Sequence, residues 1–325
     1  MARIKLDPFL MAIIAAAVVA SFLPATGIGA PVLSVATKVA IFCLFFLYGA
    51  RLHPEEALRG LKHWKLHLTI LVFTFVVFPV IGVALRPLSG LIGQDLYLGI
   101  LFMTLVPSTV QSSVAFTSIA KGNYAGAIVA ASASNLAGVF FTPLLVMLLM
   151  SAGDTIHVDT QVFIDIAVLL LLPFVLGLLL RKWVKGFAAN KATKIVDRGS
   201  ITMVVYSAFS AGMVAGVWSE VSVGQILFLV VFSIVLVAVM LWLTRFTAER
   251  LGFNDKDMKA IQFCGTKKSL ATGLPMASVI FGGASIGLLI LPLMIFHQIQ
   301  LMMCSWLAAR YARQAPPRKP VVLQS

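Results

Sequence analysis

The sequence predicts an all-α integral membrane protein with ten transmembrane helices, and three observations support that prediction. Of the 325 residues, 60% are hydrophobic and 11% are charged, and the mean hydropathy is +1.00. A soluble domain carries about 25% charged residues, so this chain could not cover its surface with polar groups. Ten stretches are apolar over about 19 residues, the length that crosses about 30 Å of hydrocarbon. The connections between them are too short to hold a soluble domain.

The first predicted span follows a basic start and ends among small residues, so it resembles a signal peptide. The nine further spans favour a first transmembrane helix instead. The ten spans are expected near residues 9–24, 31–50, 67–86, 96–119, 124–150, 162–180, 200–217, 223–244, 259–281 and 285–308.

Lysine and arginine predict the orientation of these spans. Of the 25 basic residues, 21 lie before span 1, after span 10, or between spans 2 and 3, 4 and 5, 6 and 7, and 8 and 9. These segments all fall on one side of a ten-span chain. We therefore expect both termini in the cytoplasm and the protein in the inner (plasma) membrane. The net charge of +13 follows from this topology and indicates no nucleic-acid partner.

The two halves of the chain resemble each other. Thr142-Pro143-Leu144 in span 5 matches Leu291-Pro292-Leu293 in span 10, and Gln111-Ser112-Ser113 in span 4 matches Lys267-Lys268-Ser269 in span 9, at similar offsets. Five spans are an odd number, so a second copy must be inverted, as in many secondary transporters. We predict one repeat over 1–150, an inverted repeat over 151–310, and a basic, disordered cytoplasmic tail over 311–325.

Spans 4 and 9 are the poorest continuous helices. Residues 106–123 and 264–277 each contain a proline and several hydroxyl side chains, which interrupt or compete with helix hydrogen bonds. Irregular backbone is tolerated in a membrane only where it faces protein or water. Broken helices at corresponding positions of two halves indicate a transporter's binding site. The alternative is a pair of kinked packing helices.

The segments LVPSTVQSSVAFTSIAKGN in span 4, FCGTKKSLATGLPMA in span 9 and LPLMIFHQIQLM in span 10 carry a resemblance to a known family. The chain resembles the bile acid:sodium symporter family, and within it the sodium-bile-acid-cotransporter-like branch of bacterial homologues and the seventh member of human solute carrier family 10. The similarity covers essentially the whole chain. It implies panel and core domains, with spans 4 and 9 crossing at unwound centres.

The resemblance also implies that the family's sodium ligands are largely replaced. Characterised members hold one sodium ion with a span 9 glutamate and with polar side chains of spans 4 and 5. At those positions this chain has Phe263, Val114, Ala127 and Ala131, and only Ser113 is kept. The second site uses that glutamate and glutamines of spans 9 and 3, where this chain has Lys267 and Thr74. Hard cations need several oxygen ligands, so we assign no metal site.

Lys267 and Lys268 are expected near the bilayer midplane, where a lysine costs at least about 2.5 kcal/mol. The ammonium groups could replace sodium, attract an anionic substrate, carry a proton, or only stabilise the helix crossing. We assigned Lys267 as the cation replacement or proton carrier, and Lys268 with His297 as contacts for a substrate anion. The predicted binding residues are Lys267, Lys268, Ser269, Thr266, Ser108, Thr109, Gln111, Ser112, Ser113, His297 and Gln298, with Lys38, Thr74 and Asn135 as weaker candidates.

The predicted function is a secondary transporter of a small organic anion that works by alternating access. No cofactor is expected, because the three cysteines have no ligand spacing, and the coupling ion is H⁺ or Na⁺. A GxxxxGK[ST] motif is absent, which disfavours an ATPase, and no catalytic set indicates an enzyme. The alternatives are a non-transporting membrane regulator or scaffold, and a true sodium symporter with backbone ligands. The substrate and the oligomeric state are not predicted.

Overall fold

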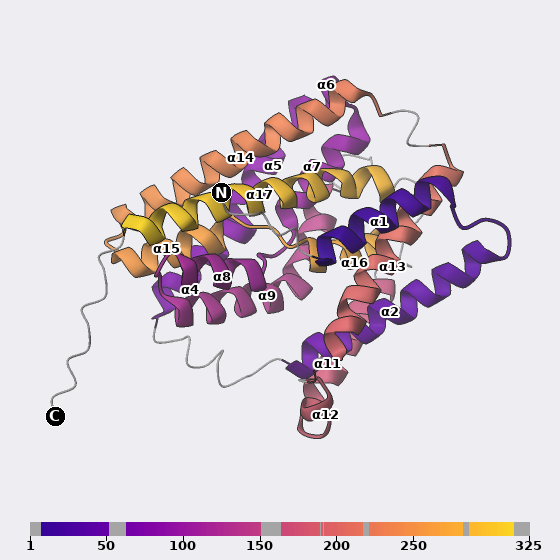
Figure 1. The fold of residues 1–325 in the computed structure, drawn as a ribbon, viewed down its shortest axis with the longest axis horizontal. Coiled ribbons are helices and arrows are strands. Elements are labelled where there is room, and N and C mark those ends of the chain that lie inside the picture. The colour runs from indigo at the N-terminus through magenta and orange to yellow at the C-terminus, as the bar shows by residue number, and fades with distance from the viewer. Residues whose placement is uncertain are drawn as a thin grey trace.

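The computed structural model describes residues 8–51, 63–150, 164–188, 190, 192–216, 221–281 and 286–314 (Figure 1). Within these ranges the chain is helical and contains no strand. The elements are α1 (Pro8–Phe22), α2 (Gly29–Arg51), α4 (Trp64–Val72), η2 (Phe73–Val77), α5 (Phe78–Ala84), η3 (Arg86–Leu88), α6 (Ser89–Ile92), α7 (Gln94–Leu105), α8 (Gln111–Ile119), α9 (Tyr124–Met150), η4 (Ala167–Leu171), α11 (Leu172–Leu179), α12 (Arg181–Ala188), α13 (Thr193–Val214), α14 (Val223–Arg250), α15 (Asp255–Gly265), α16 (Leu270–Ile280) and α17 (Ile286–Gln314).

The prediction of an all-helical membrane protein is confirmed in part. In the described ranges, five helical segments are long and apolar enough to cross a membrane: Gly29–Arg51, Trp64–Ala84, Tyr124–Met150, Val223–Arg250 and Ile286–Gln314. Predicted span 7 lies in α13, a continuous helix of 22 residues that is not among these five, and the remaining predicted spans contain shorter or interrupted helices. Ten spans in two inverted repeats therefore stay a prediction. Helix α17 continues to Gln314 and includes the first residues of the predicted 311–325 tail, whereas 315–325 lie outside the described residues.

The helices form two groups that lie side by side in Figure 1. Helices α1, α2, α11, α12 and α13 pack together, and α13 also contacts α16 and α17 of the second group. The contact between α2 and α11 is very close: a Cβ atom on Gly49 would lie 2.0 Å from the Phe174 carbonyl oxygen, and one on Gly177 would lie 2.0 Å from that of Phe46. Small residues therefore bring these two backbones together.

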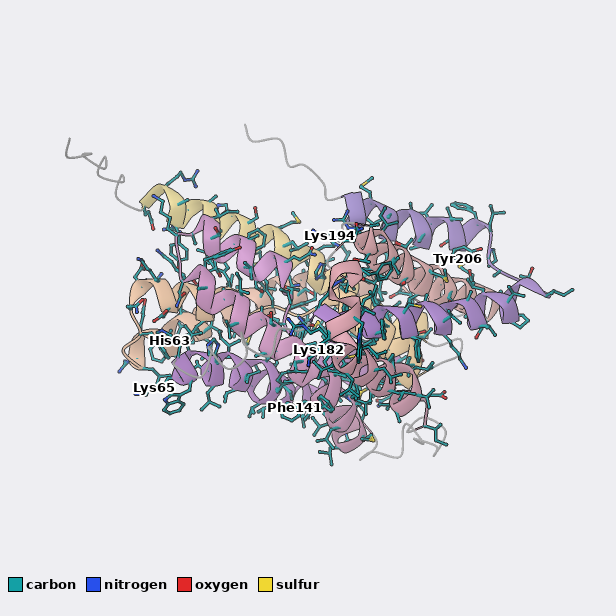
Figure 2. The ribbon with its side chains drawn as sticks, turned by 90° about the horizontal axis from the view of Figure 1, so that it is seen from below. His63, Lys65, Phe141, Lys182, Lys194 and Tyr206 are labelled. Carbon is teal, nitrogen blue, oxygen red and sulfur yellow. The ribbon has the colours of Figure 1, made fainter. Side chains whose placement is uncertain are left out.

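Aromatic side chains fix two further junctions between distant segments. Tyr206 of α13, labelled in Figure 2, donates a hydrogen bond to the Leu23 carbonyl just after α1. Phe141 of α9, also labelled there, packs edge-to-face on Phe75 of η2, with 5.5 Å between the ring centroids. The second contact holds the π-helical turn of η2 against α9.

The π-helical turn η2 interrupts the helix that covers predicted span 3. The Phe78 N–H donates to the Phe73 carbonyl, five residues earlier. It therefore does not donate to the Thr74 carbonyl, its partner in a regular α-helix. The next residue along, Pro79, has no N–H to offer. The Thr74 carbonyl is therefore left without a main-chain donor, at a buried position.

The predicted interruptions of spans 4 and 9 are present. Helix α7 ends at Leu105 and α8 begins at Gln111, and Pro107 lies in the gap between them. Helix α15 ends at Gly265 and α16 begins at Leu270. Pro275 lies inside α16, so the expectation that this proline helps to break span 9 is wrong. The gap consists of residues 266–269, which are Thr266, Lys267, Lys268 and Ser269.

Candidate functional site

The two helix gaps cross and bind each other. The Ser269 N–H donates to the Pro107 carbonyl at 2.7 Å. In the other direction, Ser108 Oγ donates to the Cys264 carbonyl at 2.6 Å, and Ser113 Oγ to the Phe263 carbonyl at 3.3 Å. Each gap thus supplies partners for main-chain groups that the other has freed from helix hydrogen bonding, as buried backbone requires.

The Lys268 ammonium is enclosed at this crossing. Its Nζ atom donates to the carbonyl oxygens of Thr74 at 2.8 Å, Thr104 at 2.7 Å and Val106 at 2.9 Å. It also lies 4.3 Å from the centroid of the Phe78 ring. The side chain is completely buried. An ammonium has three N–H donors, and here every one of them has a carbonyl acceptor.

These carbonyls are available because the helices are interrupted beside them. The π-helical turn and Pro79 free the Thr74 carbonyl, as described above. In an unbroken helix the Thr104 carbonyl would accept from the N–H of Ser108. That N–H instead donates to the Ser134 hydroxyl of α9 at 3.1 Å. The local sequence therefore creates a set of unpaired carbonyls, and a lysine from the other half of the chain fills it.

The peptide groups of Lys268 are held by Gln300 of α17. The Lys268 N–H donates to Gln300 Oε1 at 2.9 Å, and Gln300 Nε2 donates to the Lys268 carbonyl at 2.8 Å. Gln300 Nε2 is also 2.8 Å from Nδ1 of His297. Gln300 was not among the predicted site residues. Its sequence signal was an amide in an apolar helix, one turn after His297.

The Lys267 ammonium has a different environment. Its side chain is also completely buried, but among the described residues its Nζ atom has no hydrogen-bond partner. Nζ lies 3.8 Å from the centroid of the Phe116 ring of α8. The thiols of Cys264 and Cys304 are within electrostatic range. Adjacent residues thus place their ammonium groups in two separate environments, one saturated with acceptors and one without any.

These contacts differ from the roles expected for the two lysines. Lys268, expected to bind a substrate anion, has its ammonium fully occupied by carbonyl oxygens. Lys267, expected to replace the cation or to carry a proton, has no oxygen ligand among the described residues. His297 contacts the main chain of Lys268, with Nδ1 3.4 Å from its carbonyl oxygen. The cation-like environment belongs to Lys268.

The other predicted residues of span 4 surround the crossing. Thr109 Oγ1 lies 2.7 Å from Ser112 Oγ and 3.0 Å from Ser113 Oγ. Gln111 is exposed at the start of α8. Asn135 of α9 donates from Nδ2 to the Ser108 carbonyl at 3.2 Å, so this weaker candidate does belong to the crossing.

The remaining predicted residues lie on α2, α17, the π-helical turn η2 and the gap after α15. Thr266 Oγ1 lies 3.2 Å from Thr244 Oγ1 of α14. Gln298 is half-buried on α17. Thr74 contributes its carbonyl, while its hydroxyl donates to the Ile70 carbonyl. Lys38 is exposed on α2, in the other helix group, and the structure does not bring it to the crossing.

The positions where the family's sodium ligands were expected are apolar and packed. Phe263, Ala127 and Ala131 are completely buried, and Val114 packs against the hydrophobic cluster that includes Ala127. The Phe263 ring packs edge-to-face on Tyr311. Among the residues that the structure describes, no group of three or more His, Cys, Asp or Glu side chains could hold a metal.

Comparisons with known proteins find similarity over nearly the whole chain. A model of the "SBF-like CPA transporter family" matches residues 7–313. An uncharacterized protein of Pseudomonas aeruginosa is 48% identical over 95% of this chain and 93% of its own length. "Putative symporter YfeH" of Escherichia coli is 46% identical over 95% and 94%, and "Sodium/bile acid cotransporter 7" of Rattus norvegicus is 30% identical over 93% and 92%.

Proposed function

Because the chain belongs to the SBF-like CPA transporter family, as the sequence resemblance predicted, we propose that it transports an organic anion with a protein ammonium in place of a coupling sodium ion. The family is one of transporters and not of enzymes. The observation that carries the proposal is the Lys268 ammonium, which is held by three main-chain carbonyls at the crossing of two broken helices.

The Lys268 ammonium supplies the same charge as a bound sodium ion and uses the same kind of ligand. Carbonyl oxygens are hard ligands that suit hard cations, and a hydrogen bond to a charged group contributes about 1.5–3 kcal/mol. A tethered ammonium, unlike sodium, cannot leave. A dissolved sodium ion would have to displace it from all three carbonyls, and no carboxylate of the described residues contacts the Lys268 ammonium to assist. Transport would then be independent of sodium.

The helix packing supports the ten-span inverted layout as part of this proposal. In an inverted repeat, each contact between the two halves should have an equivalent contact when corresponding helices are exchanged. The α7–α17 contact corresponds to α15–α9, the α8–α17 contact to α16–α9, and the α2–α11 contact to α13–α1. All six of these pairs are in contact. Both termini would lie in the cytoplasm, at the inner membrane, and alternating access would move one helix group against the other across α13, α16 and α17.

The substrate anion would bind where α8 and α16 begin. Helix amino termini favour negative charge, and both start at the crossing. Gln111 and Ser112 lie in the first turn of α8, and the hydroxyl of Thr272, in the first turn of α16, is buried without a hydrogen-bond partner among the described residues. Helices α7, α8, α15 and α16 together carry three acidic residues, Asp95, Asp255 and Asp257. All three lie in the first turns of α7 and α15, and none lies on α8 or α16.

Two measurements test sodium independence. In proteoliposomes, taurocholate, estrone sulfate and benzoate are applied in sodium or choline buffer, and we expect flux of at least one anion that is the same in both. In thermal unfolding, NaCl and choline chloride should act equally on the wild type, whereas Lys268→Ala, with its carbonyls vacated, should be stabilised by sodium. Flux that requires sodium would contradict the proposal, and so would the absence of flux for all three anions under every gradient.

A further inference from the structure

We propose that Lys267 binds and releases the proton that couples the transport cycle, an assignment that rests on the proposed function. The two adjacent lysines would divide the work, with Lys268 as a permanent cation and Lys267 as an exchangeable one. The reason is the contrast in their surroundings. Hydrogen-bond acceptors stabilise an ammonium. In the part of the chain that the structure describes, Lys268 has three of them and Lys267 has none.

The Phe116 ring is the main group that stabilises a charged Lys267. A cation over an aromatic face is stabilised by the negative face of the ring, and Nζ lies 3.8 Å from this ring centroid. This stabilisation is less than three charge-assisted hydrogen bonds provide, so the protonated and neutral forms of Lys267 are closer in free energy than those of Lys268. Proton exchange requires two such accessible states.

Few titratable groups face Lys267 from the helices around it. Its own segment contributes Cys264, and α17 contributes Cys304. Helix α8, QSSVAFTSI, contains no titratable side chain. The acidic residue Asp257 of α15 is ten residues away, about 15 Å along a helix, and its carboxylate accepts from Asn123 and Asn254. Among the described residues, no carboxylate is placed to keep Lys267 protonated.

The proposed step is a simple proton transfer. The Lys267 amine takes a proton from water on one side of the membrane and becomes an ammonium, and in the opposite conformation it returns to the amine and gives the proton to water on the other side. No redox partner or further reactant is required. Lys267 lies in the gap between α15 and α16, so its burial would change whenever the two half-helices move relative to α8.

The experiment measures charge movement after a pH step, without substrate and without sodium. Proteoliposomes on a solid-supported membrane are stepped over a series of pH values, and the transient current is normalised to the amount of protein. The wild type should show a transient current with a defined pH midpoint. Lys267→Met and Lys267→Arg should lose at least nine-tenths of it, because neither can exchange a proton. Lys259→Met is the matched control: Lys259 is a buried lysine of α15 that pairs with Asp255 at 2.7 Å, and the current should persist.

A second variant keeps the proposal testable if Lys267 variants fail to fold. Phe116→Leu removes the ring but keeps an apolar side chain, and it should move the midpoint toward lower pH by about half a unit to one unit. An unchanged midpoint in Phe116→Leu, or a wild-type current in folded Lys267→Met, would overturn the assignment. Sodium-dependent substrate flux with a Lys267-dependent pH current would instead contradict only the proposed function.

Discussion

The Nζ atom of Lys268 lies 2.8 Å from the carbonyl oxygen of Thr74, a residue 194 positions away in the chain. The two meet because each lies where a helix departs from regular geometry. Thr74 is in a π-helical turn followed by a proline, and Lys268 is in the gap between two half-helices. A cation environment has thus been built from two local irregularities in different parts of the sequence.

Pro79→Ala should weaken this environment without removing any of its members. The substitution restores an N–H five residues after Thr74, and this donor can compete with Lys268 for the Thr74 carbonyl. We expect the flux through the protein to fall several-fold while the protein still folds. The measurement is anion flux in proteoliposomes. Normal flux together with normal unfolding behaviour would show that the proline-freed carbonyl is dispensable.

Gln300→Leu should destabilise the protein by about 2–4 kcal/mol, because it leaves the buried N–H of Lys268 unpaired and removes the shorter of the two contacts to its carbonyl. The amide makes both of those bonds, at 2.9 and 2.8 Å. Gln298→Leu is the matched control on the same helix, since Gln298 is half-buried and makes no bond to Lys268. Its effect should stay within about 0.5 kcal/mol. Equilibrium unfolding in detergent measures both, and equal effects would rule out a specific role for Gln300.

Gly177→Ala should severely reduce the yield of folded protein. The added Cβ would lie 2.0 Å from the Phe46 carbonyl oxygen, and α2 and α11 would have to separate along their contact. Gly186→Ala in α12 serves as the control, because nothing lies within 4 Å of its Cβ position. The control should be neutral or more stable by up to about 1 kcal/mol through helix propensity. Size-exclusion profiles of the two variants decide the matter, and similar profiles would contradict the close contact.

Asp197, which accepts a hydrogen bond from Arg51, should make stability depend on pH. It precedes predicted span 7, and burial raises the pKa of its carboxyl while Arg51 partly lowers it. A raised pKa means that the folded state binds the proton more tightly than the unfolded state. Stability from this group is therefore greatest below the ordinary pKa of about 3.9 and falls as pH rises through the higher folded value.

Asp197→Asn should therefore show a smaller loss of thermal stability than the wild type between about pH 4 and pH 6. An asparagine can still accept a hydrogen bond from Arg51, so the packing of α2 on α13 is retained. Thermal unfolding across this pH range is the measurement. A variant whose pH dependence equals that of the wild type would show that Asp197 titrates normally.

Much of the candidate site was predictable from the sequence, because its signals are local. Hydrophobic length indicated the membrane-spanning class. Proline with hydroxyl residues indicated the interruption of span 4, whereas in span 9 the proline lies inside α16 and only the hydroxyl residues and the lysine pair mark the gap. The lysine pair stood out because charge inside an apolar segment is costly. Gln300 was missed, since a single amide in a long apolar helix has no local feature that indicates its partner. Thr74 was a weaker candidate, and its residue type does not indicate that its carbonyl, and not its hydroxyl, contacts Lys268.

The sequence by itself thus determined that two buried ammonium groups lie between broken helices. Only the tertiary structure decided which of them is paired. Lys267 and Lys268 are chemically identical neighbours, and the unwound backbone between α15 and α16 sends one toward the carbonyls near α7 and η2 and the other toward the Phe116 ring. The surroundings of a side chain at a helix break depend on the direction of its Cα–Cβ bond and on the segments packed there, and neither follows from residue type or spacing.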